Sequence, residues 1–291
     1  MFAVSADEDI LHAQKNLCPF ATESPAEEPI FRLNVSDEDL PVAPATDAMW
    51  VDATDKDMPR IEVYREEEGD SSHWHFRIAM RAESSVGSCL TCGNDFHAAH
   101  LYVREEQDMS FCLNNALMML YAFRTASLQT LEMHASVVVR EGKGFLFLGK
   151  SGTGKSTHAR QWLRAFGDAW LLNDDNPILR VMTDGEVRVF GSPWSGKTPC
   201  YRTESVPVAA IVLLHQATQN VIRRMRLTEA YAAILSSASG LRNQPETAKD
   251  IYQTIEYIVT HVPCYHLDCL PNEEAAHICY GERFTDSNAR G

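Results

Sequence analysis

The segment from residue 149 to residue 157 holds the residues whose types and spacing most clearly suggest chemistry. It reads Gly149, Lys150, Ser151, Gly152, Thr153, Gly154, Lys155, Ser156 and Thr157, which fits the pattern Gly-x4-Gly-Lys-Ser. In this pattern the glycines let backbone N–H groups turn towards phosphate oxygens. The lysine reaches the β- and γ-phosphates, and the serine hydroxyl binds Mg²⁺. The sequence therefore predicts a binding site for ATP and Mg²⁺, the latter with Ser156 as a ligand.

The residues on both sides of this loop agree with that interpretation. The apolar run 145–148 predicts a buried strand that leads into the loop, and residues 157–163 predict a helix behind it. A helix N-terminus favours an anion because its first N–H groups have no partner within the helix. The alternative is a Gly/Ser-rich turn that binds no ligand. Such a turn would not need a strand before it, a helix after it and the complete motif between them.

Two neighbouring carboxylates follow closely. Asp174 and Asp175 end the apolar run 169–172. Such a pair downstream of a phosphate-binding loop suits Mg²⁺ coordination and the activation of an attacking hydroxyl. Because side chains alternate along a strand, we expect the two carboxylates to point in opposite directions and to have different roles. A solvated turn is the alternative.

A second glycine-rich segment, residues 191–198, also carries a lysine. We expect it to place Lys197 and backbone amides against phosphate or substrate. A structural turn anchored by Trp194 explains the same residues nearly as well.

Cys89, Cys92, His97 and His100 form a short cluster whose residue types suit tetrahedral zinc. Their spacing is far tighter than in a zinc finger, and the two histidines run into an apparent strand. We therefore predict that the cluster is metal-free. The eight cysteines of the chain are expected to be reduced thiols, because the sequence shows no secretory signal.

Composition and charge limit the classes of partner. Residues 1–110 hold 8 Lys+Arg and 23 Asp+Glu, which gives this region a net charge of −15. The remaining residues carry a net charge of +1, so the whole chain carries −14. An acidic chain repels a phosphate backbone, so we expect no nucleic-acid partner. No apolar run approaches the ~20 residues of a membrane span. We therefore expect a cytoplasmic protein without a membrane partner, and nothing in the composition opposes a homo-oligomer.

The chain divides into three predicted regions. Residues 1–29 are polar and without periodicity and predict a poorly structured arm, and residues 30–110 predict an acidic antiparallel β domain. Its strands are expected at 30–35, 61–64, 73–80 and 100–104. Residues 111–291 predict the nucleotide-binding domain, entered through an apolar helix at 111–126.

The segment before the glycine-rich loop decides between two kinds of sheet. Residues 133–140 and 145–148 read as strands, and only 141–144 connect them. So short a connection forces the two strands to be antiparallel. Ordinary P-loop NTPases instead feed the loop from a parallel sheet. Helices are expected at 228–239, with Thr228 as N-cap, and at 246–260, and a strand at 264–270.

Together these motifs resemble a known family. His134-Ala135-Ser136, the hairpin, the loop 149–157 and the pair Asp174-Asp175 resemble, in this order, the catalytic domain of HPr kinase/phosphorylase. That domain shares its fold with ATP-dependent phosphoenolpyruvate carboxykinase, and the resemblance covers about residues 131–270. It implies an α/β fold with a P-loop-bearing mixed-sheet catalytic domain. The small, mainly antiparallel N-terminal β domain is predicted separately, from the alternating segments within residues 30–110.

The resemblance also implies roles for single residues. It places His134 beside the phosphates, Asp174 at the acceptor hydroxyl and Asp175 at the metal. The loop 191–197 and the pair Arg223-Arg224 resemble a bacterial HPr-kinase-like subgroup whose substrate is unsettled.

Three functions fit this sequence. The first is a kinase that transfers the γ-phosphoryl group of ATP to a hydroxyl on a peptide, a protein or a small molecule. The second is a carboxykinase acting on an oxoacid, which would need an additional Lys/His metal site ahead of the loop, and only His134 is an obvious candidate for it. The third is a nucleotide-binding regulatory module with little turnover. The intact Lys155, Ser156 and Asp pair favour the kinase, because a binding module does not need all of them.

Overall fold

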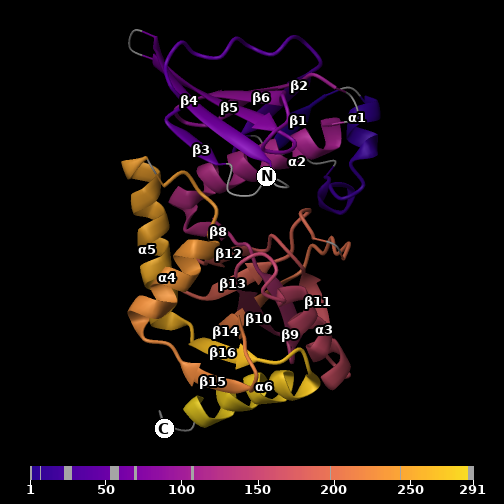
Figure 1. Cartoon of the computed structure of the whole chain (residues 1–291), viewed down its shortest axis with the longest axis vertical. Helices are drawn as coiled ribbons and strands as arrows, with labels where there is room; N and C mark the ends of the chain where they lie inside the picture. Colours follow the sequence, from indigo (N-terminus) through magenta and orange to yellow (C-terminus); the bar gives the residue numbers. More distant parts are fainter. Residues whose placement is uncertain are drawn as a thin grey trace. The chain divides into compact units, whose positions relative to one another are not determined.

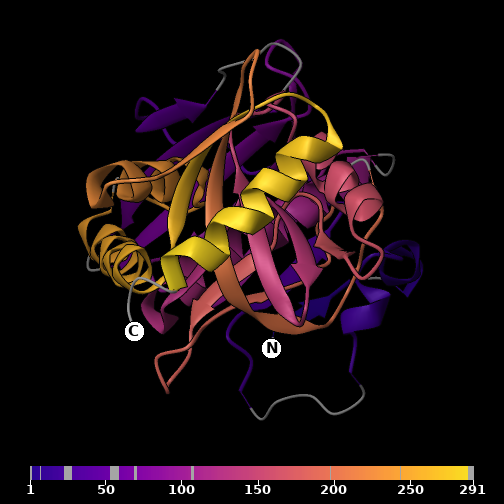
Figure 2. The ribbon, with the colours of Figure 1, turned by 90° about the horizontal axis from the view of Figure 1, so that it is seen from below.

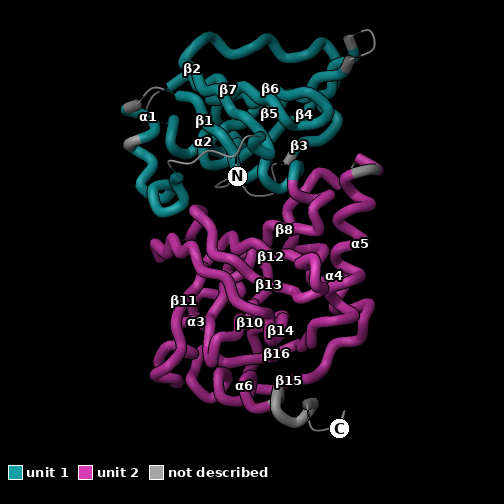
Figure 3. Tube along the Cα trace, turned by 180° about the vertical axis from the view of Figure 1, so that it is seen from behind, with its two compact units in different colours: residues 1–124 teal, residues 125–291 magenta. Residues whose placement is uncertain are grey.

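The computed structural model describes residues 2–6, 8–22, 28–52, 59–68, 71–105, 108–196, 198–242 and 244–287. The chain forms two compact units, residues 1–124 and residues 125–291, coloured separately in Figure 3. The predicted boundary at residue 110 therefore moves to residue 124. The reason is helix α2 (Met109–Thr125), whose apolar residues pack within the first unit.

The first unit is built on a seven-stranded sheet in the order β1-β2-β7-β6-β5-β4-β3. The strands are β1 (Ala3–Ser5), β2 (Arg32–Ser36), β3 (Trp50–Asp52), β4 (Arg60–Glu68), β5 (Ser71–Ala79), β6 (Val86–Gly93) and β7 (Ala98–Val103). β3 to β7 pair antiparallel, whereas β1 and β2 join the edge as parallel strands. This sheet is therefore mixed.

The predicted arm at residues 1–29 contains regular structure in its described part. β1 pairs with β2 along the sheet edge, and α1 (Glu8–Ala13) and a 3₁₀ turn (Cys18–Phe20) follow. A three-residue strand is too short to show alternation, so β1 carries no periodic signal in the sequence.

Helix α2 covers one face of this sheet (Figure 1). Its residues Leu113, Leu117 and Leu120 are fully buried. The ring of Phe123 lies 5.5 Å from that of Phe76 on β5, so the helix is held by aromatic contacts to the strand face that also buries Trp74.

The second unit is built on a nine-stranded sheet. Seven strands follow the order β11-β9-β10-β14-β13-β12-β8, and β16 pairs with both β14 and β15. The strands are β8 (Thr130–Glu132), β9 (Ser136–Arg140), β10 (Lys143–Leu148), β11 (Trp170–Asn173), β12 (Ile178–Val181), β13 (Val187–Phe190), β14 (Ser205–Gln216), β15 (Val221–Arg224) and β16 (Cys264–Cys269).

The pairing around β10 confirms the predicted hairpin. β9 and β10 are antiparallel, with Phe145 opposite Val138, and the turn between them places Glu141 and Gly142 at positive φ. On its other side β10 pairs parallel with β14. The unit is therefore a mixed α/β domain, and the strand before the glycine-rich loop has one antiparallel and one parallel neighbour.

Helices cover both faces of this sheet. α3 (Lys155–Ala165) and α6 (Glu273–Ser287) lie on one face, where Trp162 of α3 packs against Phe145 and Phe147 of β10. Figure 2 shows α6, in yellow, running across the strands. α4 (Leu227–Ser237) and α5 (Pro245–His261) cover the other face, packing on Leu146 and Leu148.

Two smaller outcomes concern the helices. α4 starts one residue earlier than expected, and its N-cap is Arg226 rather than Thr228, because the Glu229 carboxylate accepts the Arg226 backbone N–H at 2.9 Å. In the described part of the chain, each helix is too short or too polar to pass through a lipid bilayer.

Candidate nucleotide-binding and active site

The glycine-rich loop joins the end of β10 at Leu148 to the start of α3 at Lys155. Gly152 and Gly154 have φ angles of 80° and 103°, a region that favours glycine because a Cβ atom is strained there. With Gly154 as the N-cap residue, the first N–H groups of α3 face the loop without a side-chain cap. The local structure is thus the strand, loop and helix N-terminus that an anion site needs.

The ammonium group of Lys155 is buried against this loop and touches a histidine. The residue is 7% exposed, and its Nζ donates to the carbonyl of Gly149 at 2.9 Å. Nζ also lies 3.0 Å from Nε2 of His134. Burial lowers the pKa of Lys155, and the nearby Asp175 and Asp174 carboxylates act in the opposite direction. A buried cation here is poised to gain from an incoming anion.

His134 is fixed by its backbone rather than by its ring. Its N–H donates to the carbonyl of Ser237 at 2.7 Å, and the next N–H, of Ala135, donates to the carbonyl of Asp175 at 2.8 Å. Burial, then the positive charge of Lys155, lower the pKa of His134. The imidazole is therefore neutral near pH 7, with Nε2 accepting from Lys155.

Nε2 of His134 also lies 3.5 Å from Oδ1 of Asp175. The same nitrogen cannot accept from Lys155 and donate to Asp175, and the contact to Lys155 is shorter. We therefore assign the hydrogen bond to Lys155 and treat the Asp175 contact as proximity. Burial raises the pKa of Asp175, while His134 and Lys155 oppose that rise.

The two carboxylates lie in different surroundings, but strand alternation is not the cause. β11 ends at Asn173, and the side chain of Asn173 accepts the N–H of Asp175 at 2.9 Å, which turns the chain. Asp174 is 4% exposed and accepts from the hydroxyl of Ser136 at 3.0 Å through Oδ1. Its Oδ2 is buried and has no hydrogen-bond partner within the described ranges.

The second glycine-rich segment lies against this turn. Nδ2 of Asn173 donates to Oγ of Ser192 and to the carbonyl of Trp194, both at 3.1 Å. A Cβ atom on Gly196 would come within 3.4 Å of Cβ of Asp175, so backbone and carboxylate are close neighbours. The segment therefore reaches the site, whereas Lys197 lies outside the described residues.

Sequence reasoning missed a carboxyl group beside this site. Glu132, on β8, is 1% exposed, and neither carboxyl oxygen has a hydrogen-bond partner among the residues that the structure describes. Burial and, to a smaller extent, the Asp175 charge raise its pKa to about 8. The sequence could have pointed to Glu132 through its position two residues before His134, because residues i and i+2 of an extended chain face the same side.

A cleft of about 420 Å³ opens beside the glycine-rich loop. Gly152, Thr153 and Gly154 line one side of it, and the ends of β14 and β16 line the other through residues such as Gln216 and Cys269. Nε2 of Gln216 donates to the carbonyls of Gly152 and Thr153, both at 3.2 Å. Lys155, His134 and the Asp pair are not part of its lining, so the cleft extends the site away from the charged cluster.

The cysteines and histidines expected to be metal-free lie in the first unit. Cys89 and Cys92 are buried on β6, with Tyr102 and Ala99 as their partners across the sheet. Nε2 of His100 lies 2.8 Å from the hydroxyl of Ser36. Their freedom from metal stays a prediction, to be tested by metal analysis.

Comparison of the sequence with protein families gives one match. The profile described as "SynChlorMet cassette protein ScmC" matches residues 100–272, which is more than half of the chain. The chain belongs to the ScmC family. The matched range contains every residue placed at the candidate site above, from Glu132 to Cys269.

Two further comparisons add little to the ScmC assignment. Among curated proteins no match is found. Among solved structures, the HPr(Ser) kinase/phosphatase from Coxiella burnetii is similar, with 13% sequence identity and a TM-score of 0.32. The similarity covers 55% of this chain and 99% of that one. A score this low supports no conclusion about function.

Proposed function

We propose that this ScmC-family chain is an ATP-dependent kinase that transfers the γ-phosphoryl group to a hydroxyl. The observation that carries the proposal is the meeting of Lys155, His134 and Asp175 at the mouth of a glycine-rich loop. The three residues come from separate segments, and the Lys155–His134 and His134–Asp175 contacts measure 3.0 and 3.5 Å. A structural turn does not require a buried ammonium group and a pair of carboxylates.

The residues present fit Mg-ATP. The left-handed glycines leave the loop amides free to turn towards phosphate, and the buried oxygen Oδ2 of Asp174 has no partner in the described chain. We propose that residues 149–157 bind the phosphates, that Lys197 adds a second positive charge, and that Ser156 and Asp175 hold Mg²⁺. Bound Mg²⁺ would neutralise charge on the phosphate oxygens. The 420 Å³ cleft beside Gly152 is suitably placed for the nucleoside.

The transfer step follows from this arrangement. The acceptor hydroxyl gives its proton to Asp174 while its oxygen forms a bond to the γ-phosphorus, and the bond to the bridging β-oxygen breaks to release ADP. Lys155 stabilises the negative charge on the phosphates, and His134, neutral and hydrogen-bonded, fixes the position of the ammonium group. Most of the rate enhancement in such reactions comes from alignment and charge stabilisation.

Apo geometry does not exclude Asp174 as the base. Oδ1 is occupied by Ser136, but Oδ2 keeps its lone pairs. Catalytic hydrogen bonds are often formed only when substrate is present. We therefore keep Asp174 at the acceptor and Asp175 at the metal, as the HPr kinase resemblance implies.

The test is incubation of the whole chain with γ-labelled ATP and either a cell lysate or a pool of small metabolites. Label on a macromolecule or on a hydroxyl-bearing metabolite supports the kinase and identifies the acceptor class. Oxoacid-dependent turnover would instead indicate the carboxykinase, and nucleotide binding without turnover would indicate the regulatory module.

The matched variants are Lys155→Ala and Lys143→Ala. Lys155→Ala should abolish transfer and weaken ATP binding, because the charge that faces the phosphates is lost while the backbone loop remains. Lys143 is exposed at the start of β10, so Lys143→Ala should leave both unchanged. Unaltered turnover in Lys155→Ala would contradict the nucleotide site itself.

A further inference from the structure

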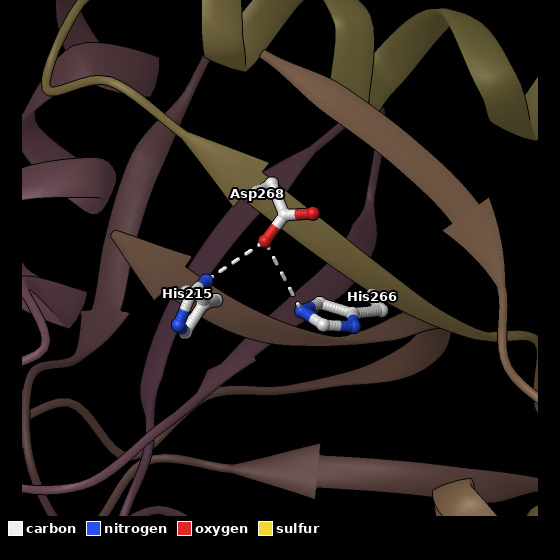
Figure 4. Close-up of side chains that lie close together, drawn as sticks. All are labelled: His215, His266 and Asp268. Carbon is white, nitrogen blue, oxygen red and sulfur yellow. Dashed lines mark hydrogen bonds and ion pairs between the residues drawn. The ribbon is translucent and has the colours of Figure 1, made fainter. Parts of the chain in front are cut away.

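Three side chains with metal-ligand chemistry meet on the strands of the second unit, outside the candidate active site. They are His215 on β14 and His266 and Asp268 on β16, and their ligand atoms all lie within 4.8 Å of one another. Figure 4 shows both imidazole rings directed towards the Asp268 carboxylate. Nδ1 of His215 lies 2.8 Å from Oδ1 of Asp268, and Nε2 of His266 lies 3.5 Å from the same oxygen.

The sheet itself holds the three residues together. β14 and β16 pair parallel with His215 directly opposite Asp268, and His266 lies two residues before Asp268 on the same face. Strand positions are rigid compared with loop positions, so this spacing does not depend on a flexible segment. The three side chains are 67%, 23% and 41% exposed in the order His215, His266, Asp268, which leaves an approach from solvent.

We propose that His215, His266 and Asp268 bind a divalent transition-metal ion, for which Zn²⁺ is the appropriate probe. Two imidazole nitrogens and one carboxylate oxygen suit Zn²⁺, which binds nitrogen and oxygen at about 2.0–2.2 Å. Tetrahedral bonds of that length separate ligand atoms by about 3.4 Å. The observed 2.8 and 3.5 Å bracket this value, so small side-chain rotations suffice. Mg²⁺ prefers oxygen ligands and should bind poorly.

The positively charged side chain of Arg223 competes with a metal ion for His266. The guanidinium group of Arg223, on β15, lies 3.0 Å from Nδ1 of His266 and pairs with Glu229 at 3.1 Å. An arginine N–H can only donate, so Nδ1 accepts and Nε2 carries the proton in this state. Nε2 of His266 is buried and has no hydrogen-bond partner in the part of the chain described. When metal replaces that proton, Nδ1 must carry a hydrogen, and Arg223 must withdraw to Glu229 alone.

The site is independent of the proposed kinase chemistry, since it shares no residue with it. It is nevertheless joined to the glycine-rich loop through the next residue of β14, because Gln216 donates to the carbonyls of Gly152 and Thr153. An ion that fixes the ends of β14 and β16 binds the folded chain more tightly than the unfolded one and therefore raises the melting temperature.

The experiment uses the full chain, freed of metal with a chelator and titrated with ZnCl₂ or MgCl₂. Calorimetry gives the zinc stoichiometry and affinity, and thermal unfolding gives the stabilisation. One Zn²⁺ per chain and a higher melting temperature are expected, with no comparable effect of MgCl₂. His215→Ala and Asp268→Asn, both at partly exposed positions that tolerate substitution, should each weaken zinc binding by more than about tenfold, since even outer-shell losses cost 10–100-fold.

Two more variants make the assignment specific. Arg223→Met should tighten zinc binding by about threefold to tenfold, because a positive charge and a competing donor are removed. The double variant Cys89→Ser/Cys92→Ser, in the other unit, should bind zinc as the wild type does. Absence of zinc binding by the wild type, or zinc binding unchanged in both His215→Ala and Asp268→Asn, would overturn the proposal. Loss of zinc only in the cysteine variant would overturn it as well, and would also show the Cys89–His100 cluster to be the metal site.

Discussion

The second unit contains two clusters of similar composition in different surroundings. In each, a cationic side chain lies 3.0 Å from a histidine nitrogen, and that histidine lies 3.5 Å from an aspartate oxygen. Lys155, His134 and Asp175 form the first cluster, beside a glycine-rich loop and the N-terminus of a helix. In the second cluster, Arg223 takes the place of lysine, and His266 and Asp268 lie on a strand that solvent reaches.

The difference shows how surroundings assign chemistry to the same residue types. Burial shifts the pKa values of Lys155 and His134 downwards and that of Asp175 upwards, so the first cluster favours a ligand that restores negative charge. In the function proposed above, a phosphate group does so and accepts hydrogen bonds from the loop amides. The second cluster has a second histidine, His215, beside the Asp268 carboxylate, and this set of side chains suits a cation.

The largest expected effect is on the rate of phosphoryl transfer, when the carboxylates next to the first cluster are replaced. Asp174→Asn should leave Mg-ATP affinity nearly intact and reduce transfer by roughly 10²–10⁴, the usual contribution of a positioned acid–base group. Asp175→Asn should instead raise the Mg²⁺ concentration needed for activity. Calorimetric Mg-ATP affinity and single-turnover rates for each variant measure the two effects separately.

Ser136→Ala is the matched control, since it removes only the hydroxyl that donates to Asp174 Oδ1. It should reduce transfer far less than Asp174→Asn. Loss of nucleotide affinity in Asp174→Asn together with full affinity in Asp175→Asn would reverse the two roles. If neither variant changes transfer, the turn after β11 is structural and the mechanism is wrong.

Much of this architecture could be predicted from the sequence, and the reasons are local. The β9–β10 hairpin followed from a connection too short for a crossover, and the pairing of Phe145 with Val138 confirms it. The long helices α2 and α5 were predicted to within two residues of their ends. Periodicity carried these assignments because each element spans several repeats of its pattern.

The parts that were missed depend on contacts between distant residues. β6 was not recognised because its buried residues do not alternate clearly, and the parallel pairing of β1 and β2 joins segments about 30 residues apart. At the site, Asn173 ends the strand and turns Asp175 out of it, which an alternation argument cannot anticipate. The cluster of His215, His266 and Asp268 required the register of β14 against β16.

A smaller effect, on the pH dependence of stability, tests whether burial sets the pKa values of the histidines in this unit. His158 on α3 is 3% exposed, accepts from Trp162 Nε1 at 3.1 Å, and burial lowers its pKa from 6.5 to about 4. Below pH 6.5 the unfolded chain therefore binds a proton that the folded chain refuses. The free energy of unfolding should fall by about 3 kcal/mol between pH 6.5 and about 4 from this residue alone.

His158→Gln and His158→Phe both remove the titrating group, and Gln keeps an acceptor for Trp162. Denaturant unfolding of the wild type and both variants at several pH values is the measurement. Both variants should lose part of the pH dependence between pH 6.5 and 4, whatever their stability at pH 7. The same slope in all three proteins would show that His158 is protonated in the folded chain.

The last expected effect concerns Glu132, the buried carboxyl beside the first cluster. Its pKa is raised from 4.5 to about 8, so the folded chain keeps a proton that the unfolded chain releases, and stability is lost as pH rises from 4.5 to 8. Glu132→Gln stays neutral and should therefore be more stable than the wild type by several kcal/mol at pH 9, because each pKa unit between 4.5 and about 8 contributes about 1.4 kcal/mol. Near pH 4.5 the two proteins should be equally stable. Glu256→Gln, on the exposed side of α5, is the matched control and should show no such crossover. A Glu132→Gln variant that is less stable than the wild type at every pH would mean that the carboxylate has hydrogen-bond partners in the folded chain. Burial would then not distinguish the surroundings of the first cluster from those of the second.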